Sequence, residues 1–242
     1  MVDRLFADSE LAALYDDLCA GRRDFAFYLP LVMGASSVLD IGCGTGELLG
    51  LAREAGHRGR LCGLDPAAAM VALARRREDV EWILGDLSTV AWDGAFELAV
   101  MTGHAFQVLL TDDDVLGALR AVRRALKAGG RFVFETRNPL VRGWERWEAE
   151  RETEVVDGSG AVVGVSYKVH AVEGELVTFS ATYRSAAWAQ DAVSWSTLRF
   201  LEREPLVRLV ERVGLKVVEQ YGDWDGSPVG DGSPEIILVT TP

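Results

Sequence analysis

The chain has 242 residues, of which 49% are hydrophobic and 26% charged, a composition typical of a folded globular protein rather than a disordered or fibrous one. Its 25 Lys and Arg residues against 37 Asp and Glu residues give a net charge of −12, so nucleic acids and anionic membranes are unfavourable partners. Three scattered cysteines without a CxxC pair, and three histidines without metal-ligand spacing, lead us to expect reduced thiols, a cytoplasmic location and no metal site.

The first 35 residues predict two helices rather than a signal peptide. Acids stand near the N-terminus, where a signal peptide needs a basic flank, and no apolar stretch of the chain approaches the roughly 20 residues that span a bilayer. The first helix is expected at Ser9–Ala20, with Leu11 and Leu14 on one face, and the second at Asp24–Met33. We expect both to pack on the open edge of a sheet.

The pattern from Ser36 to Arg137 predicts a parallel sheet with crossover helices. Runs rich in Val, Ile and Leu alternate with longer amphipathic stretches, and the runs are continuously apolar, as in strands covered on both faces. The predicted strands are Ser37–Ile41, Arg60–Asp65, Val80–Leu84, Phe96–Thr102 and Arg131–Thr136. The predicted helices are Glu47–Ala55, Ala67–Arg77 and Asp112–Leu126.

The last of these helices is the best defined, since Thr111 or Asp112 can cap it and Gly129–Gly130 can stop it. Together these elements indicate a doubly wound α/β core.

From about Glu152 the apolar period changes from 3.6 residues to two, which predicts an antiparallel meander. A helix and two strands then follow, at Pro205–Val213, Leu215–Tyr221 and Glu235–Thr240. We therefore divide the chain into a core of residues 1–151 and 202–242 and an inserted antiparallel β subdomain of residues 152–201.

The most informative segment is Val38–Leu49, VLDIGCGTGELL, in which an apolar strand runs into a glycine-rich turn and then a helix. Its glycines permit a tight turn and a close approach of the backbone to a ligand, and the helix N-terminus supplies unpaired N–H groups. A dinucleotide fold holds a pyrophosphate in such a turn, but the spacing here is GxGxG rather than GxGxxG. Asp40, at the end of the strand, would repel a pyrophosphate and attract an ammonium group.

Val38–Leu49 resembles motif I of the class I S-adenosylmethionine (SAM) dependent methyltransferases. The likeness continues, in the order of that family's motifs, at Asp65 in GLDPAAAM, Gly85–Leu87, Phe96–Phe106 and Gly129–Glu135. It covers the core from Ser36 to Arg137 and the terminal strand pair at Val217–Thr240. The resemblance implies a Rossmann-like sheet that is mostly parallel and has an antiparallel last strand.

The resemblance also implies that the core binds SAM and releases S-adenosylhomocysteine. In the family, the acid matching Asp65 accepts hydrogen bonds from both ribose hydroxyls, and the one matching Asp86 meets the adenine amine. Asp65 could also cap the next helix, and the two roles can coexist. Asp86 could serve its own turn, and Met70 and Phe106 could either sandwich the adenine or pack in the core. The residues expected around the cofactor are Tyr15, Asp40, Gly42, Cys43, Gly44, Gly46, Asp65, Pro66, Met70, Gly85, Asp86, Leu87, Thr102, Gly103 and Phe106.

Candidate residues for the methyl acceptor follow strands four and five, because ligands bind at the carboxyl ends of strands in open α/β sheets. His104 and Glu135 are the candidate catalytic bases, and His104 has the better matched pKa. His104 could instead brace the cofactor, and Glu135 could pair with Arg137. We expect the acceptor to contact Tyr28, Arg137, Asn138 and Trp144.

A β block after strand five is similar to the arrangement in small-molecule methyltransferases such as the deoxysugar N,N-dimethyltransferases and glycine N-methyltransferase, where it covers the acceptor. The leading hypothesis is therefore a SAM-dependent methyltransferase, a monomer or homodimer, that acts on nitrogen or oxygen rather than carbon of a small molecule. One alternative is a SAM-binding module without turnover. An NAD-linked oxidoreductase is disfavoured by Asp40 and the glycine spacing.

Overall fold

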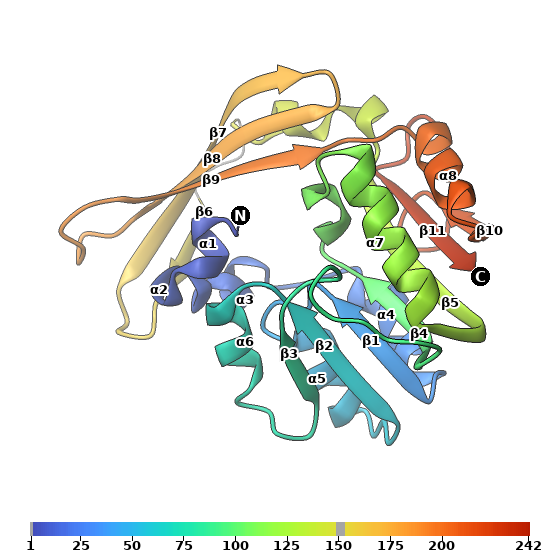
Figure 1. The fold of residues 1–242 in the computed structure, drawn as a ribbon. Helices are drawn as coiled ribbons and strands as arrows, with labels where there is room; N and C mark the ends of the chain where they lie inside the picture. Colours follow the sequence, from blue (N-terminus) through green and yellow to red (C-terminus); the bar gives the residue numbers. More distant parts are fainter. Residues whose placement is uncertain (1, 149–152) are drawn as a thin grey trace.

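The computed structural model describes residues 2–148 and 153–242 and contains two β-sheets (Figure 1). The larger sheet has the strand order β10-β11-β5-β4-β1-β2-β3, in which β11 is antiparallel to both neighbours and the other pairs are parallel. Its strands are β1 (Ser37–Ile41), β2 (Arg60–Asp65), β3 (Glu81–Leu84), β4 (Phe96–Met101), β5 (Leu126–Arg137), β10 (Lys216–Tyr221) and β11 (Glu235–Thr241). The predicted doubly wound sheet with an antiparallel last strand is confirmed.

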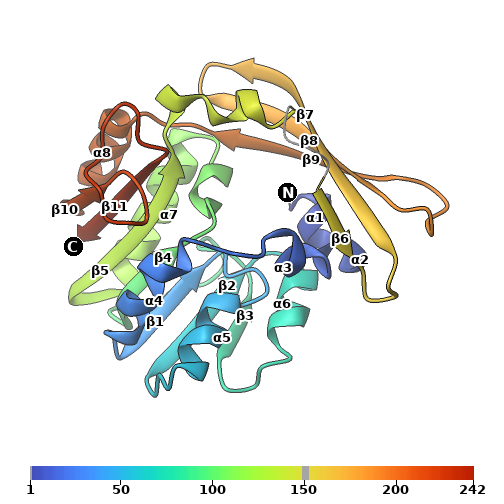
Figure 2. The ribbon, with the colours of Figure 1, turned by 180° about the vertical axis from the view of Figure 1, so that it is seen from behind.

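Helices cover both faces of this sheet because its central strands are apolar on both sides. Val38 of β1 packs in the apolar cluster that includes α4 (Phe25–Met33) and α5 (Glu47–Glu54). The next residue, Leu39, packs in the opposite cluster, with α7 (Asp112–Ala125) and α8 (Arg203–Arg212). Figure 1 shows α7 in front of the sheet, and Figure 2, from behind, shows α4 and α5 on the other side.

Two details of the helix predictions are wrong, the packing of the second helix and the stop signal of α7, whose bounds otherwise agree with the prediction to within one residue. Helix α4 lies on a face of the sheet rather than at its edge, because Tyr28 and Val32 are buried among strand residues. Helix α7, capped by Thr111, ends at Ala125. Gly129 and Gly130 do not stop it but lie inside β5, whose ladder with β4 already begins at Leu126.

The predicted first helix is three short ones, α1 (Arg4–Ala7), α2 (Ser9–Ala12) and α3 (Tyr15–Leu18). The side chain of Asp8 accepts a hydrogen bond from Glu10 N and so caps α2 directly after α1. Leu11 and Leu14 pack against the smaller sheet, whereas Ala12 packs against Met70 of α6 (Ala68–Ala74). The N-terminal segment therefore lies between the smaller sheet and α6 rather than on the edge of the larger sheet.

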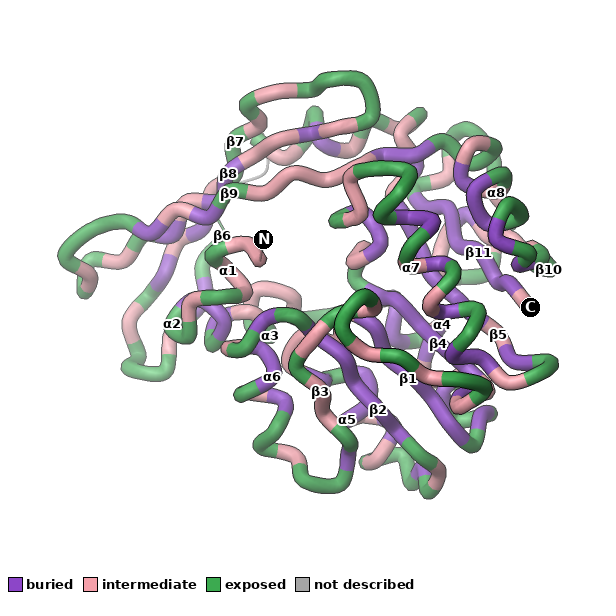
Figure 3. Tube along the Cα trace, viewed as in Figure 1, coloured by how far each residue is buried: buried purple, intermediate pink, exposed green. Residues whose placement is uncertain are grey.

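The smaller sheet is an antiparallel meander of β6 (Thr153–Val156), β7 (Val162–Glu173), β8 (Leu176–Arg184) and β9 (Ala192–Arg199). Its buried residues form two separate groups, one against the N-terminal helices and one around Trp144 and Phe200 (Figure 3). The predicted subdomain boundary at residues 151 and 152 lies outside the described residues.

The described residues also contain three short 3-10 helices, η1 (Ala105–Val108), η2 (Pro139–Val141) and η3 (Gly143–Arg146). Within the described ranges, no helix combines the length and the apolar character needed to cross a membrane.

Candidate functional site

The glycine turn joins β1 to α5 at the carboxyl edge of the larger sheet. Gly42 and Gly46 have φ of 72° and 82°, a conformation that favours glycine. Neighbouring groups also leave no room for a side chain, since a Cβ on Gly46 would lie 2.2 Å from the Trp82 ring and one on Gly42 2.8 Å from Ala105 Cβ. The sequence of this turn is therefore dictated by backbone conformation and close packing together.

Asp65, at the end of β2, holds the turn in place. Its Oδ2 accepts a hydrogen bond from Gly44 N at 2.9 Å, and its Oδ1 accepts one from Ala67 N at 2.8 Å, at the start of α6. Burial raises the pKa of this carboxyl group although both hydrogen bonds oppose the shift. Asp65 thus fixes the residue before α6 rather than serving as the N-cap, which is Ala67, and each of its oxygens retains a lone pair for a ligand.

Asp40 is the least satisfied acid of the site. Its side chain is buried, and its Oδ1 has no hydrogen-bond partner among the described residues. Burial, together with the nearby carboxylates of Asp65 and Glu135, raises the pKa of Asp40 to about 7 against the opposing effect of Arg22. A buried carboxylate without a partner is costly, so this position suits a ligand that brings positive charge or an N–H donor.

Asp86 follows β3 and is exposed. Its Oδ1 accepts hydrogen bonds from the N and Oγ of Ser88, at 2.8 and 2.5 Å, and these bonds lower its pKa. The turn role that the sequence left open for Asp86 is therefore present. Of its neighbours, Gly85 N bonds to Asp65 O, and Leu87 packs against the main core.

Met70 and Phe106 both lie in apolar clusters, as expected from their alternative role in core packing. Met70 is 1% exposed beside Ala12, and Phe106 stacks on Phe134 with ring centroids 4.4 Å apart. Neither the Phe106 ring nor the Met70 thioether is exposed in this structure. Burial also raises the pKa of the Cys43 thiol well above its ordinary value, which leaves Cys43 a lining residue rather than a nucleophile.

The other predicted cofactor residues border the same turn. Tyr15 packs edge-on against Phe6 and lies 3.9 Å from the position of a Cβ on Gly44. Pro66 is exposed after Asp65, and Thr102 and Gly103 follow β4 beside the guanidinium group of Arg22.

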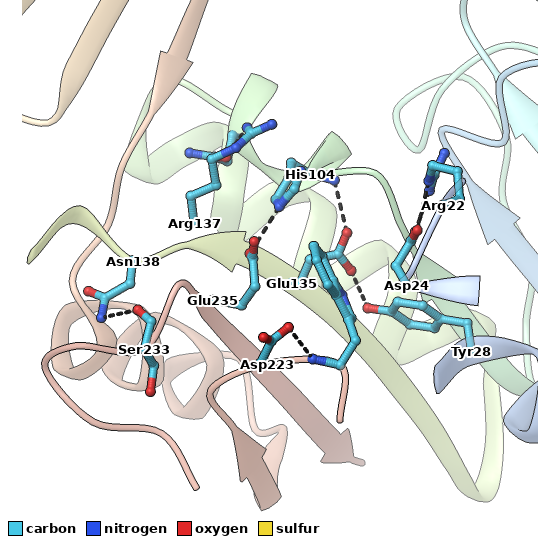
Figure 4. Close-up of polar contacts among 12 residues, drawn as sticks. Arg22, Asp24, Tyr28, His104, Glu135, Arg137, Asn138, Asp223, Ser233 and Glu235 are labelled. Carbon is cyan, nitrogen blue, oxygen red and sulfur yellow. Dashed lines mark hydrogen bonds and ion pairs between the residues drawn. The ribbon is translucent and has the colours of Figure 1, made fainter. Parts of the chain in front are cut away.

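A second group of polar side chains lies at the ends of β4, β5 and β11 (Figure 4). Glu135 is 0% exposed, accepts a hydrogen bond from the Tyr28 hydroxyl, and accepts another from the backbone N of His104 at 2.9 Å. Burial raises its pKa to about 7. Because Glu135 is fully buried and each of its oxygens accepts a hydrogen bond from the protein, it holds the loop of His104 and exposes no oxygen to act as a base.

The same geometry bears on the expectation for Tyr28 and on the ion pair that the sequence left open for Glu135. Tyr28 is 0% exposed, so it supports Glu135 from α4 and does not reach an acceptor. The alternative ion pair between Glu135 and Arg137 does not form, because Arg137 instead donates to Gln107 Oε1 at 2.8 Å.

His104 keeps a partly exposed imidazole in a left-handed backbone conformation with φ of 62°, which is uncommon for a residue other than glycine. Its Nε2 lies 2.9 Å from Glu235 Oε2 at the start of β11. Burial, with the nearby Arg137 and Arg22, lowers the pKa of His104, and burial raises that of Glu235 to about 9. The imidazole is therefore neutral at neutral pH, and its lowered pKa makes it a weaker proton acceptor than a free imidazole.

Two predicted acceptor residues have structural roles instead. The Asn138 amide donates to the carbonyls of Gly230, Asp231 and Ser233, and its oxygen accepts from Leu140 N, so it fastens the loop before β11. Trp144 is 7% exposed and packs on Phe200, which joins the smaller sheet to the core.

Sequence reasoning missed Arg22, Gln107 and Glu235. Arg22 lies in the segment before α4 and pairs with Asp24. Its Nη2 lies 3.5 Å from Thr102 Oγ1. Of these three residues, only Glu235 could have been identified as a candidate from the sequence, because it is an acid at the start of a continuously apolar strand. The site as a whole is acid-rich, since Asp24, Asp40, Asp65, Glu135 and Glu235 are buried there, and the nearby arginines among the described residues are the half-buried Arg22 and Arg137. Among the described residues no group of three His, Cys, Asp or Glu side chains is arranged to hold a metal ion.

Residues 38–130 match the protein family described as "Methyltransferase domain". The chain is 39% identical over 127 residues to a 2-phytyl-1,4-naphtoquinone methyltransferase of Thermosynechococcus vestitus, a match covering 50% of this chain and 55% of that protein. It is 26% identical over 219 residues to a cypemycin N-terminal methyltransferase of a Streptomyces species, covering 84% and 82%.

The fold is similar to that of an S-adenosylmethionine-dependent methyltransferase from Clostridium acetobutylicum, with a TM-score of 0.75 and 17% identity, over 95% of this chain and 96% of that one. The match with the 2-phytyl-1,4-naphtoquinone methyltransferase spans about half the length of that protein. The matched family is one of methyltransferases, which favours the interpretation of the glycine turn as a methyltransferase motif rather than as a dinucleotide-binding turn.

Proposed function

We propose that this chain, which carries a methyltransferase domain of the class I, SAM-dependent type, transfers the methyl group of SAM to a small-molecule acceptor. The observation that carries the proposal is the buried Asp40 carboxylate beside the glycine turn, with one oxygen that has no partner among the described residues. SAM brings an ammonium group and a sulfonium centre to a site that is rich in acids. The residues therefore fit this cofactor.

We assign the binding of SAM to the glycine turn and three carboxylates. Asp40 receives the ammonium group, and Asp65 accepts the ribose hydroxyls through the lone pairs that its two backbone bonds leave. Asp86 takes the adenine amine. Arg22, beside Thr102 and Gly103, is the cation placed to receive the carboxylate of the same ligand.

When bound, SAM supplies a methyl group on a positively charged sulfur. Because such a transfer disperses charge rather than creating it, the contribution of the protein is alignment and the exclusion of water. His104 takes the proton of a hydroxyl or ammonium acceptor, while Glu235 orients its ring and Glu135 holds its backbone. A neutral imidazole is the protonation state that this role requires.

We place the acceptor between these strand ends and the smaller sheet, and we expect nitrogen or oxygen to be methylated. Tyr167 and Phe179 lie on the same face of that sheet as the buried Val163 and Val165, which supports a covering role for it. We also propose a cytoplasmic location. All three cysteines lie in described segments and none forms a disulfide, which supports that location.

Isothermal titration with S-adenosylhomocysteine tests the cofactor assignment directly, and no detectable binding by folded protein would refute it. Transfer of label from methyl-labelled SAM to a panel of small amines, alcohols and carboxylic acids then tests turnover. Binding without transfer to any acceptor would favour the SAM-binding module over the enzyme.

A further inference from the structure

Arg137 ends β5 next to the proposed acceptor region, and two side chains, those of Gln107 and Trp147, contact its guanidinium group. Nη1 donates to Gln107 Oε1 of η1 at 2.8 Å, and the guanidinium carbon lies 5.7 Å from the centre of the Trp147 ring. Figure 4 shows the guanidinium group pointing away from Glu235 and Glu135. Trp147 in turn packs on Phe179 of β8, so this cation lies where the core meets the smaller sheet.

Both ends of the Gln107 amide are hydrogen-bonded, and this fixes its orientation toward Arg137. Gln107 is 1% exposed, and its Nε2 donates to the backbone carbonyl of Arg199 in β9 at 3.0 Å, which fixes the amide so that its oxygen faces Arg137. A buried amide that bridges a strand of the smaller sheet to a guanidinium group sets the orientation of that group. Arg137 is therefore held in one direction rather than free to leave for solvent.

The guanidinium group is nevertheless incompletely satisfied. An arginine offers five N–H donors, and among the described residues Arg137 makes one hydrogen bond and no ion pair. Burial also lowers the pKa of Arg137, although the nearby Glu235 and Glu135 oppose the shift. A positioned, half-buried cation with several unused donors is complementary to a planar anion that can accept two of them.

The surrounding charges select the kind of anion. Two acids, Glu135 and Glu235, already lie near Arg137, and burial raises the pKa of both, so the region disfavours a large additional negative charge. A carboxylate carries one negative charge and matches the single positive charge of Arg137, whereas a phosphate monoester carries nearly two. The balance of charge therefore favours a carboxylate.

We infer that Arg137 anchors a carboxylate group of the methyl acceptor, with Gln107 as its positioning residue. The substrate class is then a small molecule that carries a carboxylate. This inference rests on the proposed function, because it assumes that the region beside His104 receives the acceptor.

The test measures binding to protein that has first been saturated with S-adenosylhomocysteine. Isothermal titration compares matched probes, phenylacetate with phenylacetamide and hexanoate with hexanamide, and adds phenyl phosphate. The variants are Arg137→Gln and Arg137→Lys, with Arg131→Gln, earlier on the same strand, as the control. We expect each carboxylate to bind at least about tenfold more tightly than its amide in the wild type and in Arg131→Gln.

Arg137→Gln should abolish this preference, and Arg137→Lys should retain only part of it, because an ammonium group keeps the charge but not the planar pair of donors. Equal binding of carboxylate and amide by the wild type, tighter binding of phenyl phosphate, or a preference that survives in Arg137→Gln would overturn the inference. If Arg137→Gln does not fold, the wild-type ratio and Arg137→Lys decide. Failure of S-adenosylhomocysteine to bind would instead refute the proposed function.

Discussion

Replacement of Asp40 by Asn should stabilise the free protein while weakening its binding of cofactor. Asp40 is buried, its Oδ1 has no partner among the described residues, and its pKa is raised to about 7 from an ordinary 3.8. Since the folded state holds this proton more tightly than the unfolded chain, the acid costs no stability below pH 4. The cost grows as the pH rises and is complete above pH 7.

A pKa moved from 3.8 to about 7 corresponds to roughly 4 kcal/mol at pH 8. Asn also needs hydrogen-bond partners, so we expect Asp40→Asn to recover about 1–3 kcal/mol of this. Urea unfolding at pH 5 and pH 8 measures the effect, with exposed Asp93→Asn as the control. The stabilisation should be larger at pH 8 than at pH 5.

The same substitution should weaken S-adenosylhomocysteine binding by a factor of about 10 or more, the value of a hydrogen bond to a charged group. In the wild type, affinity should increase as the pH rises toward 7, because ionised Asp40 is the form that attracts an ammonium group. The pH dependence should be smaller in Asp40→Asn. Unchanged affinity, or an identical pH dependence in variant and wild type, would refute the electrostatic reasoning for this site.

Three further predictions concern the supporting structure. Asp65→Ala should lose roughly 1–3 kcal/mol of S-adenosylhomocysteine affinity through unpaired ribose hydroxyls, and an unchanged dissociation constant in titration calorimetry would remove its assigned role. Gly46→Ala should destabilise the fold by about 2–4 kcal/mol, because its Cβ would meet the Trp82 ring at a positive φ; an unaltered melting temperature would contradict this. Tyr28→Phe should cost about 1–3 kcal/mol in urea unfolding by leaving a buried Glu135 oxygen unpaired, without contact with the cofactor; a variant as stable as wild type would count against that bond.

The sequence by itself determined the core, because its signals are local. A continuously apolar strand, a glycine turn and a capped helix are each specified by neighbouring residues, and β1 and β2 have the predicted bounds. The meander was equally readable from its period of two. The position of Asp65 at the end of a strand followed from the same patterns.

Only the tertiary structure decided which polar side chains remain available to a ligand. Asn138 lies after β5 as expected, but its amide is hydrogen-bonded to the loop before β11. Tyr28 lies before β1 as expected, but its hydroxyl donates to Glu135. Partners more than 90 residues away in the chain leave no local pattern. The same holds for Glu235, which meets His104 across 131 positions because β11 inserts antiparallel beside β5. Strand order, which no short segment encodes, sets these long-range pairs.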